Sequence, residues 1–149
     1  MTTDGRRKLE LKTPRTADPA AAAILNEAQA SMGMIPNLYA MMANAPALLD
    51  VYRFGYEAFR KRSGFSPVEQ EVVLLTISFV NGCDYCMAAH SVVADKFSHV
   101  PPVVTEALRT GTAVPDVRLQ ALRELTHKIV ETRGRPSRLD LDRCVEEGY

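Results

Sequence analysis

The sequence predicts an all-α protein. Polar caps, prolines and glycines divide the chain at intervals that suit helices. Between them, apolar residues recur at helical spacing, and no stretch alternates as an exposed strand would. With 149 residues, 46 % of them hydrophobic and 24 % charged, the chain is long enough for one domain with its own core.

The N-terminal segment, residues 1–17, is polar and carries Pro14, so it is predicted to be a flexible arm. The rest, 18–149, is predicted to form a single all-helical domain. Its first helix lies in "ADPAAAAILNEAQASMG", where Asp18 suits the N-cap and Gly33 suits the stop.

Two further helices are expected before residue 63. The segment "IPNLYAMMANAP" predicts a short helix that ends at Pro46. Residues 46–62 predict a longer helix, because large apolar side chains recur along it one turn apart. These side chains are Leu48, Leu49, Tyr52, Tyr56 and Phe59.

The stretch "GFSPVEQEVVLLTISFVNG" carries the clearest helix signal. Ser66 and Glu69 form a capping-box pattern, and Pro67 occupies the first helical position. The β-branched residues within 72–80 would also suit a strand. Because of the capping box and the length, we predict a helix, and one so apolar that it must be covered on every side.

A hairpin is expected next. Asn81-Gly82 is a stop signal, and the following helix is predicted from Cys83 to Phe97, so the two helices form a central antiparallel pair. Three more helices are predicted, in "PPVVTEALRTG", "VPDVRLQALRELTHKIVETRG" and "SRLDLDRCVEEGY".

Charge and hydropathy exclude several functional classes. Eighteen basic and eighteen acidic residues give no net charge, which argues against binding to nucleic acid or to an anionic membrane. No apolar run reaches the roughly 20 residues of a membrane span. The N-terminus lacks the apolar core of a signal peptide, so a cytoplasmic location is expected. In that reducing compartment, a close cysteine pair indicates catalysis or metal binding.

That pair lies in "NGCDYCMAAH". On a helix at about 100° per residue, Cys83, Cys86 and His90 fall within roughly 60° of one another. Both thiols are expected in the first turn, where backbone N–H groups and the helix dipole stabilise a thiolate. His90 lies four residues after Cys86 and can take its proton. Cys83, one turn back, is placed to close a disulfide.

A carboxylate partner for His90 is expected on the preceding helix. Glu71 lies about 11 residues before the turn and His90 about 8 after it, so their heights differ by only about 5 Å. Glu71 could therefore reach the outer nitrogen of His90, directly or through water, where it would orient the imidazole and raise its basicity. Glu69 is the weaker candidate because it belongs to the cap.

Two other interpretations of these residues remain. The cysteines and His90 could bind zinc with Glu71 or His99 as the fourth ligand, or they could be a helix face without chemistry. Tyr85 is expected to form a pocket wall, and its hydroxyl could donate a hydrogen bond to a bound oxygen.

The segment "SPVEQEVVLLTISFVNGCDYCMAAH" resembles the core motif of the alkylhydroperoxidase D-like and carboxymuconolactone decarboxylase-like proteins. That motif is a glutamate, a cysteine twelve residues later, and the pattern C-x-x-C-x-x-x-H. The resemblance extends more loosely over residues 35–149. It implies an alkylhydroperoxidase D-like helical fold that assembles into homo-trimers or homo-hexamers.

The resemblance also implies a function. Family members with both cysteines are similar to thiol peroxidases that reduce alkyl hydroperoxides without a cofactor or metal. By that likeness Cys86 becomes the sulfenic acid, Cys83 resolves it, and His90 and Glu71 relay protons. The reductant that it suggests is a dihydrolipoyl protein. The chain departs from the best-known members at Tyr85, where they carry a histidine, and this removes one relay group.

Alternatives to a peroxidase remain: a decarboxylase-like enzyme, a general dithiol oxidoreductase, or a zinc-binding interaction module. The apolar residues 72–80 separately indicate the oligomeric state. A chain of short helices is expected to cover only part of that segment, which predicts an obligate homo-oligomer.

Overall fold

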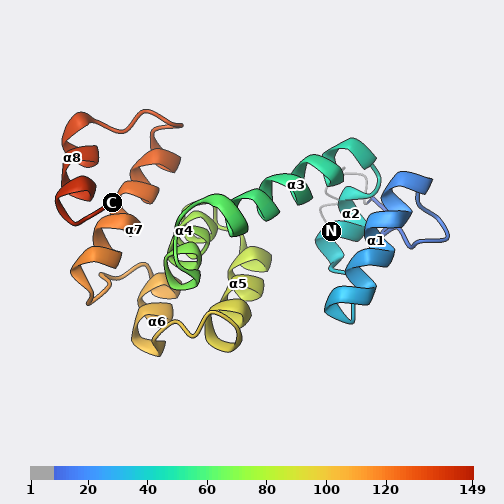
Figure 1. Cartoon of the computed structure of the whole chain (residues 1–149), viewed down its shortest axis with the longest axis horizontal. Coiled ribbons are helices and arrows are strands. Elements are labelled where there is room, and N and C mark those ends of the chain that lie inside the picture. The colour runs from blue at the N-terminus through green and yellow to red at the C-terminus, as the bar shows by residue number, and fades with distance from the viewer. Residues whose placement is uncertain (1–8) are drawn as a thin grey trace, which may run out of the picture. The chain divides into compact units, whose positions relative to one another are not determined.

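The computed structural model describes residues 9–149, which form eight α-helices and no strand (Figure 1). The all-α prediction is confirmed. Residues 1–8 of the predicted arm lie outside the described residues. The helices are α1 (Pro19–Met32), α2 (Asn37–Met42), α3 (Pro46–Arg62), α4 (Pro67–Val80), α5 (Asp84–Lys96), α6 (Pro102–Thr110), α7 (Val117–Glu131) and α8 (Arg138–Glu146).

The contacts within the chain divide it into two compact units, one ending at Lys61 and the other running from Arg62 to Tyr149. The grouping of residues 18–149 into a single domain stays a prediction. No helix formed by residues 9–149 combines the length and the apolar character that crossing a membrane requires.

The first unit packs α1, α2 and the start of α3 around a small core. The buried core residues are Ala21, Ile24, Leu25, Ala43 and Leu49. As expected, the Asp18 carboxylate accepts the Ala20 N–H at the start of α1, and Gly33 ends that helix in the left-handed conformation. Lys12 N–H donates to the Ala40 carbonyl at 2.9 Å, which ties the segment before α1 to α2.

The second unit is built around α4, which contacts α5, α6 and α7 (Figure 1). Its buried core residues are Val72, Leu75, Ala94, Val100, Val104, Ala107, Leu108, Val114 and Leu122. A helix that is apolar on most faces occupies the centre of a helical domain because only there can every face be covered. The antiparallel pairing of α4 and α5 confirms the predicted central hairpin.

The predicted capping box begins α4. Ser66 Oγ accepts the Glu69 N–H at 3.3 Å, and Glu69 Oε2 accepts the Ser66 N–H at 2.7 Å. These bonds satisfy two of the N–H groups that a helix start leaves unpaired. The choice of helix over strand for this segment is therefore confirmed.

The expectation that the chain would cover only part of α4 is borne out in part. Within residues 72–80, Phe79 is exposed, and Val73, Leu74, Ile77 and Val80 are half-buried. The three helices packed against α4 bury its other side chains there. Large exposed apolar side chains also lie on other helices, among them Leu48, Val51 and Phe54 of α3.

Glu69 gives the fold a dependence on pH. Burial alone raises the pKa of this carboxyl, but the hydrogen bonds from Ser66 and the charge of Arg118, at 3.0 Å, outweigh burial and lower it. A carboxyl with a lowered pKa in the folded state stabilises the fold above its unfolded-state pKa. That stabilisation is lost as pH falls through the folded-state pKa.

We therefore expect Glu69→Gln to cost about 1 kcal/mol of unfolding free energy at neutral pH and much less near pH 3. Urea unfolding, followed by circular dichroism at both pH values, measures the difference. Asp142→Asn, at an exposed carboxylate of α8, is the matched control. An equal loss at both pH values would show that the carboxylate charge is not what stabilises the cap.

Candidate dithiol site

The start of α5 positions the first cysteine. Gly82 adopts a positive φ of 59°, which turns the chain between α4 and α5. Cys83 follows in an extended conformation as the N-cap, so it lies just before the first turn in which it was expected. Its N–H donates to the Ser78 carbonyl at 2.9 Å, and its sulfur accepts the Cys86 N–H at 3.2 Å.

Cys83 and Cys86 are joined by a disulfide, with their Cα atoms 5.3 Å apart. Both residues are half-buried. A pair in a C-x-x-C pattern at a helix start can close this ring without displacing the helix, because residues three apart share a face. The disulfide is the oxidised form of a two-electron dithiol couple.

Glu71 and His90 meet between the two helices of the hairpin. Glu71 Oε2 lies 3.1 Å from His90 Nδ1, and Glu71 is fully buried. The direct contact agrees with the similar heights expected for the two residues. When Nδ1 carries the proton and donates it to the carboxylate, Nε2 keeps a lone pair that can accept a proton. The contact with Glu71 holds the imidazole in one orientation.

The remaining residues of the motif lie along α5. His90 follows Cys86 by four residues, one helical turn away on the same face. Tyr85 is 44 % exposed, and it does not line the cavity beside Cys83. The hairpin therefore brings the cysteine pair, His90 and Glu71 together, while much of the Tyr85 ring faces solvent.

An open cavity of about 240 Å³ lies beside Cys83. Its walls come from α4, α5, α6 and the turn between α4 and α5. The lining residues are Ser78, Phe79, Gly82, Cys83, Asp84, Met87 and Arg109. Phe79 and Arg109 carry no motif signal in the sequence, and Arg109 reaches the site only because α6 packs against α5.

Arg109 is held in place by three contacts. Its Nε donates to Ser91 Oγ at 2.9 Å, and its Nη2 donates to Asp95 Oδ2 at 2.8 Å. Its Nη1 lies 3.7 Å from a Glu106 carboxylate oxygen. The guanidinium therefore forms a fixed part of the cavity wall, and its charge is shared with neighbouring carboxylates.

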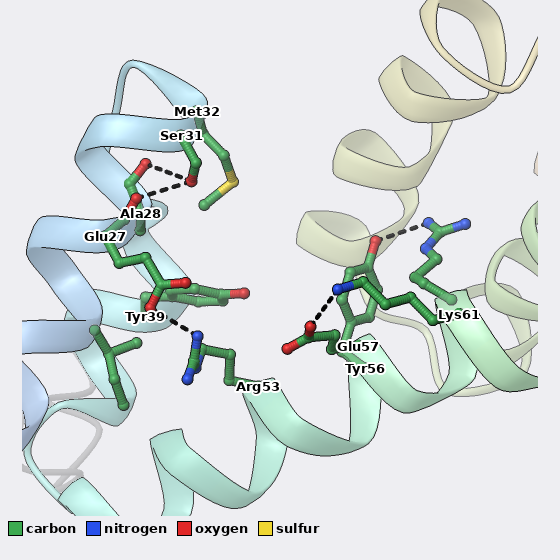
Figure 2. A pocket seen from close by; sticks show the side chains of 11 residues that line it. Glu27, Ala28, Ser31, Met32, Tyr39, Arg53, Tyr56, Glu57 and Lys61 are labelled. Atoms are coloured by element: carbon green, nitrogen blue, oxygen red, sulfur yellow. Dashed lines mark hydrogen bonds and ion pairs between the residues drawn. The ribbon is translucent and has the colours of Figure 1, made fainter.

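A larger cavity, of about 320 Å³, lies in the first unit between α1, α2 and α3 (Figure 2). Four of its charged side chains form two pairs: Arg53 donates to Glu27 at 2.7 Å, and Lys61 pairs with Glu57. Arg60 donates to the Tyr56 hydroxyl at 2.7 Å. Neither a cysteine nor a histidine lines it. Its size alone does not make it the site of thiol chemistry, so the cavity beside Cys83 is the better candidate.

The zinc interpretation requires four ligand side chains close together. Among residues 9–149, no group of three or more histidine, cysteine, aspartate and glutamate side chains is arranged to hold a metal ion. Cys144 is buried in α8, and burial raises the pKa of its thiol.

Comparison with known proteins identifies the family. The sequence model of the Carboxymuconolactone decarboxylase family matches residues 46–126, more than half of the chain. The chain belongs to this family. The matched residues contain the whole α4–α5 hairpin, and with it the disulfide, the Glu71–His90 pair and the cavity beside Cys83.

A solved structure confirms the fold of this carboxymuconolactone decarboxylase family member. It is an uncharacterized peroxidase-related protein from Ralstonia eutropha JMP134, described as an alkylhydroperoxidase AhpD core. The TM-score is 0.80 at 20 % sequence identity, over 95 % of this chain and 75 % of that one. No curated protein matches the chain. The predicted alkylhydroperoxidase D-like fold is therefore confirmed.

Proposed function

We propose that this family member is an enzyme, a thiol-dependent peroxidase that reduces alkyl hydroperoxides with the Cys83–Cys86 pair. The observation that carries the proposal is the hydrogen bond between His90 and the buried Glu71, one turn from a cysteine pair that forms a disulfide. A thiol nucleophile needs an oriented base, and this arrangement supplies one. The solved peroxidase-related structure of the same fold also supports it.

The proposed cycle begins with both thiols reduced. His90 accepts the Cys86 proton, and the thiolate attacks one oxygen of the hydroperoxide. The O–O bond breaks, the alkoxide takes the proton and leaves as an alcohol, and Cys86 becomes a sulfenic acid. The Cys83 thiol then condenses with that sulfenic acid, which forms the disulfide and releases water.

A dithiol must then return the pair to the reduced state. The family resemblance suggests a dihydrolipoyl protein as this reductant, and a reducing compartment such as the cytoplasm would supply it. The second candidate is a general dithiol oxidoreductase that does not act on peroxides. Tyr85 favours this alternative, because it stands where the best-known peroxidases of the family carry a relay histidine.

Stoichiometric oxidation tests the proposal. Reduced protein with Cys144 replaced by serine is mixed with one equivalent of an alkyl hydroperoxide, and a sulfenic-acid probe is added in a parallel sample. We expect mass spectrometry to find a transient adduct at Cys86 and then the Cys83–Cys86 disulfide. Oxidation no faster than that of a free thiol would reject the peroxidase and leave the dithiol oxidoreductase.

We also propose that the protein is a homo-oligomer, either a trimer or a hexamer. An exposed stripe on α3 supports it, since Leu48, Val51 and Phe54 are 54 %, 69 % and 66 % exposed. We expect light scattering at micromolar concentration to give a multiple of 16.5 kDa, and Val51→Glu to lower that mass. Glu10→Gln, at an exposed carboxylate, should not lower it. A stable wild-type monomer would contradict the proposal.

A further inference from the structure

We propose that the cavity beside Cys83 receives an uncharged, apolar dithiol arm of the reductant, whose thiolate attacks Cys83 rather than Cys86. The inference rests on the proposed thiol-dependent function, and it adds the sulfur that is attacked, the route of entry and the selectivity. Four features of the structure carry it: access to one sulfur, the shape of the cavity, its charge, and the two leaving groups.

Access favours Cys83. The cavity is lined by Cys83 and not by Cys86, although the disulfide joins the two. Its volume of about 240 Å³ is below the roughly 300–1,000 Å³ of pockets that enclose drug-sized ligands. A slender arm can therefore enter, whereas a bulky thiol cannot be enclosed.

Apolar side chains form two of the walls. Met87 lies one helical turn after Cys83 on α5, and Phe79 extends from the last turn of α4. A methyl group on Gly111 would overlap the Phe79 ring, so the ring rests directly on the backbone at the end of α6. Gly111 thus allows Phe79 to pack closely there, and the ring remains 43 % exposed at the cavity.

The charges around the cavity disfavour an anionic arm. Arg109 is the one base among its lining residues, and it is already paired with Asp95 and Glu106. Asp84 adds a third carboxylate, and it is the one carboxylate among the lining residues. The carboxylates outnumber the guanidinium, so a carboxylate carried by the incoming thiol meets net repulsion.

The two exchange steps balance with this order of attack. First, the reductant thiolate attacks Cys83 Sγ and forms a mixed disulfide, and Cys86 leaves as a thiolate in the first turn of α5. Second, the other thiol of the reductant, as a thiolate, attacks the reductant sulfur of that mixed disulfide, and Cys83 leaves. The reductant ends as a cyclic disulfide, and both cysteines end reduced after taking up the two thiol protons.

The structure provides for both leaving groups. Cys86 has His90 one turn along the helix, so an imidazole that has accepted the proton of the attacking thiol can pass it to the departing thiolate. The Cys83 sulfur already accepts the Cys86 N–H at 3.2 Å, so the second thiolate leaves with a hydrogen-bond donor in place. A better-stabilised leaving thiolate departs faster.

The first experiment identifies the attacked sulfur. The Cys144→Ser protein is oxidised with diamide, so that no peroxide is needed, then mixed with β-mercaptoethanol and quenched rapidly with an alkylating reagent. We expect peptide mass spectrometry to find the mixed disulfide on Cys83 and the alkyl group on Cys86. The reverse labelling would overturn the proposal.

The second experiment tests the walls and the charge. Dihydrolipoamide and dihydrolipoate carry the same dithiol and differ in one charge, and dithiothreitol lacks the long chain. Each dithiol's rate with the protein is divided by its rate with a free disulfide. On that scale we expect dihydrolipoamide to reduce the oxidised protein about threefold faster than dihydrolipoate. Asp84→Asn should narrow that ratio, whereas Asp142→Asn should not. Equal normalised rates would overturn the charge selectivity.

Phe79→Ala should slow reduction by dihydrolipoamide about tenfold, because an apolar wall contact is lost. Reduction by dithiothreitol should change less than twofold, and Phe79→Leu should retain most of the rate. Phe97→Ala, an exposed phenylalanine just after α5, is the matched control. Equal slowing with both dithiols would mean that Phe79 only supports the fold, and would overturn its role in binding.

These experiments separate the two proposals. All of them use the diamide-oxidised protein, so they report on the disulfide whether or not a peroxide formed it. Failure to react with hydroperoxides would reject the peroxidase and leave the selectivity at Cys83 intact. Attack at Cys86 with normal peroxide oxidation would reject the inference and leave the peroxidase intact.

Discussion

Cys86→Ser is expected to abolish peroxide turnover, whereas Cys83→Ser is expected to permit the first oxidation and block recycling. Serine cannot form a sulfenic acid, so the first variant loses the reacting atom. In the second, the sulfenic acid at Cys86 forms but finds no thiol at the start of α5 with which to condense. Stopped-flow single turnovers, with mass spectrometry of the products, distinguish the two.

Cys144→Ser is the matched control, since that cysteine is buried in α8 and takes no part in the disulfide. It is expected to turn over at the wild-type rate. If the two hairpin variants gave the same first-turnover rate, the assignment of Cys86 as the peroxide-reacting thiol and Cys83 as the resolving one would be wrong.

Glu71→Gln and Glu71→Leu should both lower kcat, by about 10–100-fold for the leucine variant and less for the glutamine variant. Glutamine can still accept the His90 Nδ1–H through its amide oxygen, but it loses the charge. Leucine removes both the hydrogen-bond acceptor and the charge, so the imidazole loses its fixed orientation. Comparing the kcat values of the two variants separates the contribution of the hydrogen bond from that of the charge. Steady-state kinetics measures both values.

A purely structural role for Glu71 would lower the amount of folded protein without altering the shape of the pH–rate profile. We expect that shape to change in both variants, because the group that sets the imidazole tautomer has been altered. Glu69→Gln on the same helix is the control, since its carboxylate binds the cap and Arg118 rather than His90. An unchanged profile for Glu71→Leu would show that Glu71 has no part in proton transfer.

The helices and the hairpin could be predicted from the sequence because their signals are local. Asp18 and Ser66 accept backbone N–H groups a few residues away, and Gly33 ends α1 through its own φ angle. Such contacts depend on neighbours along the chain, so they can be predicted without knowing the tertiary structure.

The centre of the candidate site could be predicted for the same kind of reason. Cys83, Cys86 and His90 lie on one helix, where spacing alone puts them on one face. Glu71 lies on the adjacent helix, and the short turn after α4 limits how far the two can slide past each other. Counting residues on either side of that turn predicted that the two could meet, directly or through water, and the structure shows the direct contact.

The surroundings of the disulfide depend on contacts between helices far apart in the sequence. Arg109 reaches the Cys83 cavity, and Gly111 lies against the Phe79 ring, because α6 folds back beside α5 and α4; no spacing rule relates either residue to the cysteines. The extent to which α4 is covered likewise depends on how three other helices pack against it. Contacts between residues far apart in the chain depend on how whole helices pack, and local patterns do not contain that information.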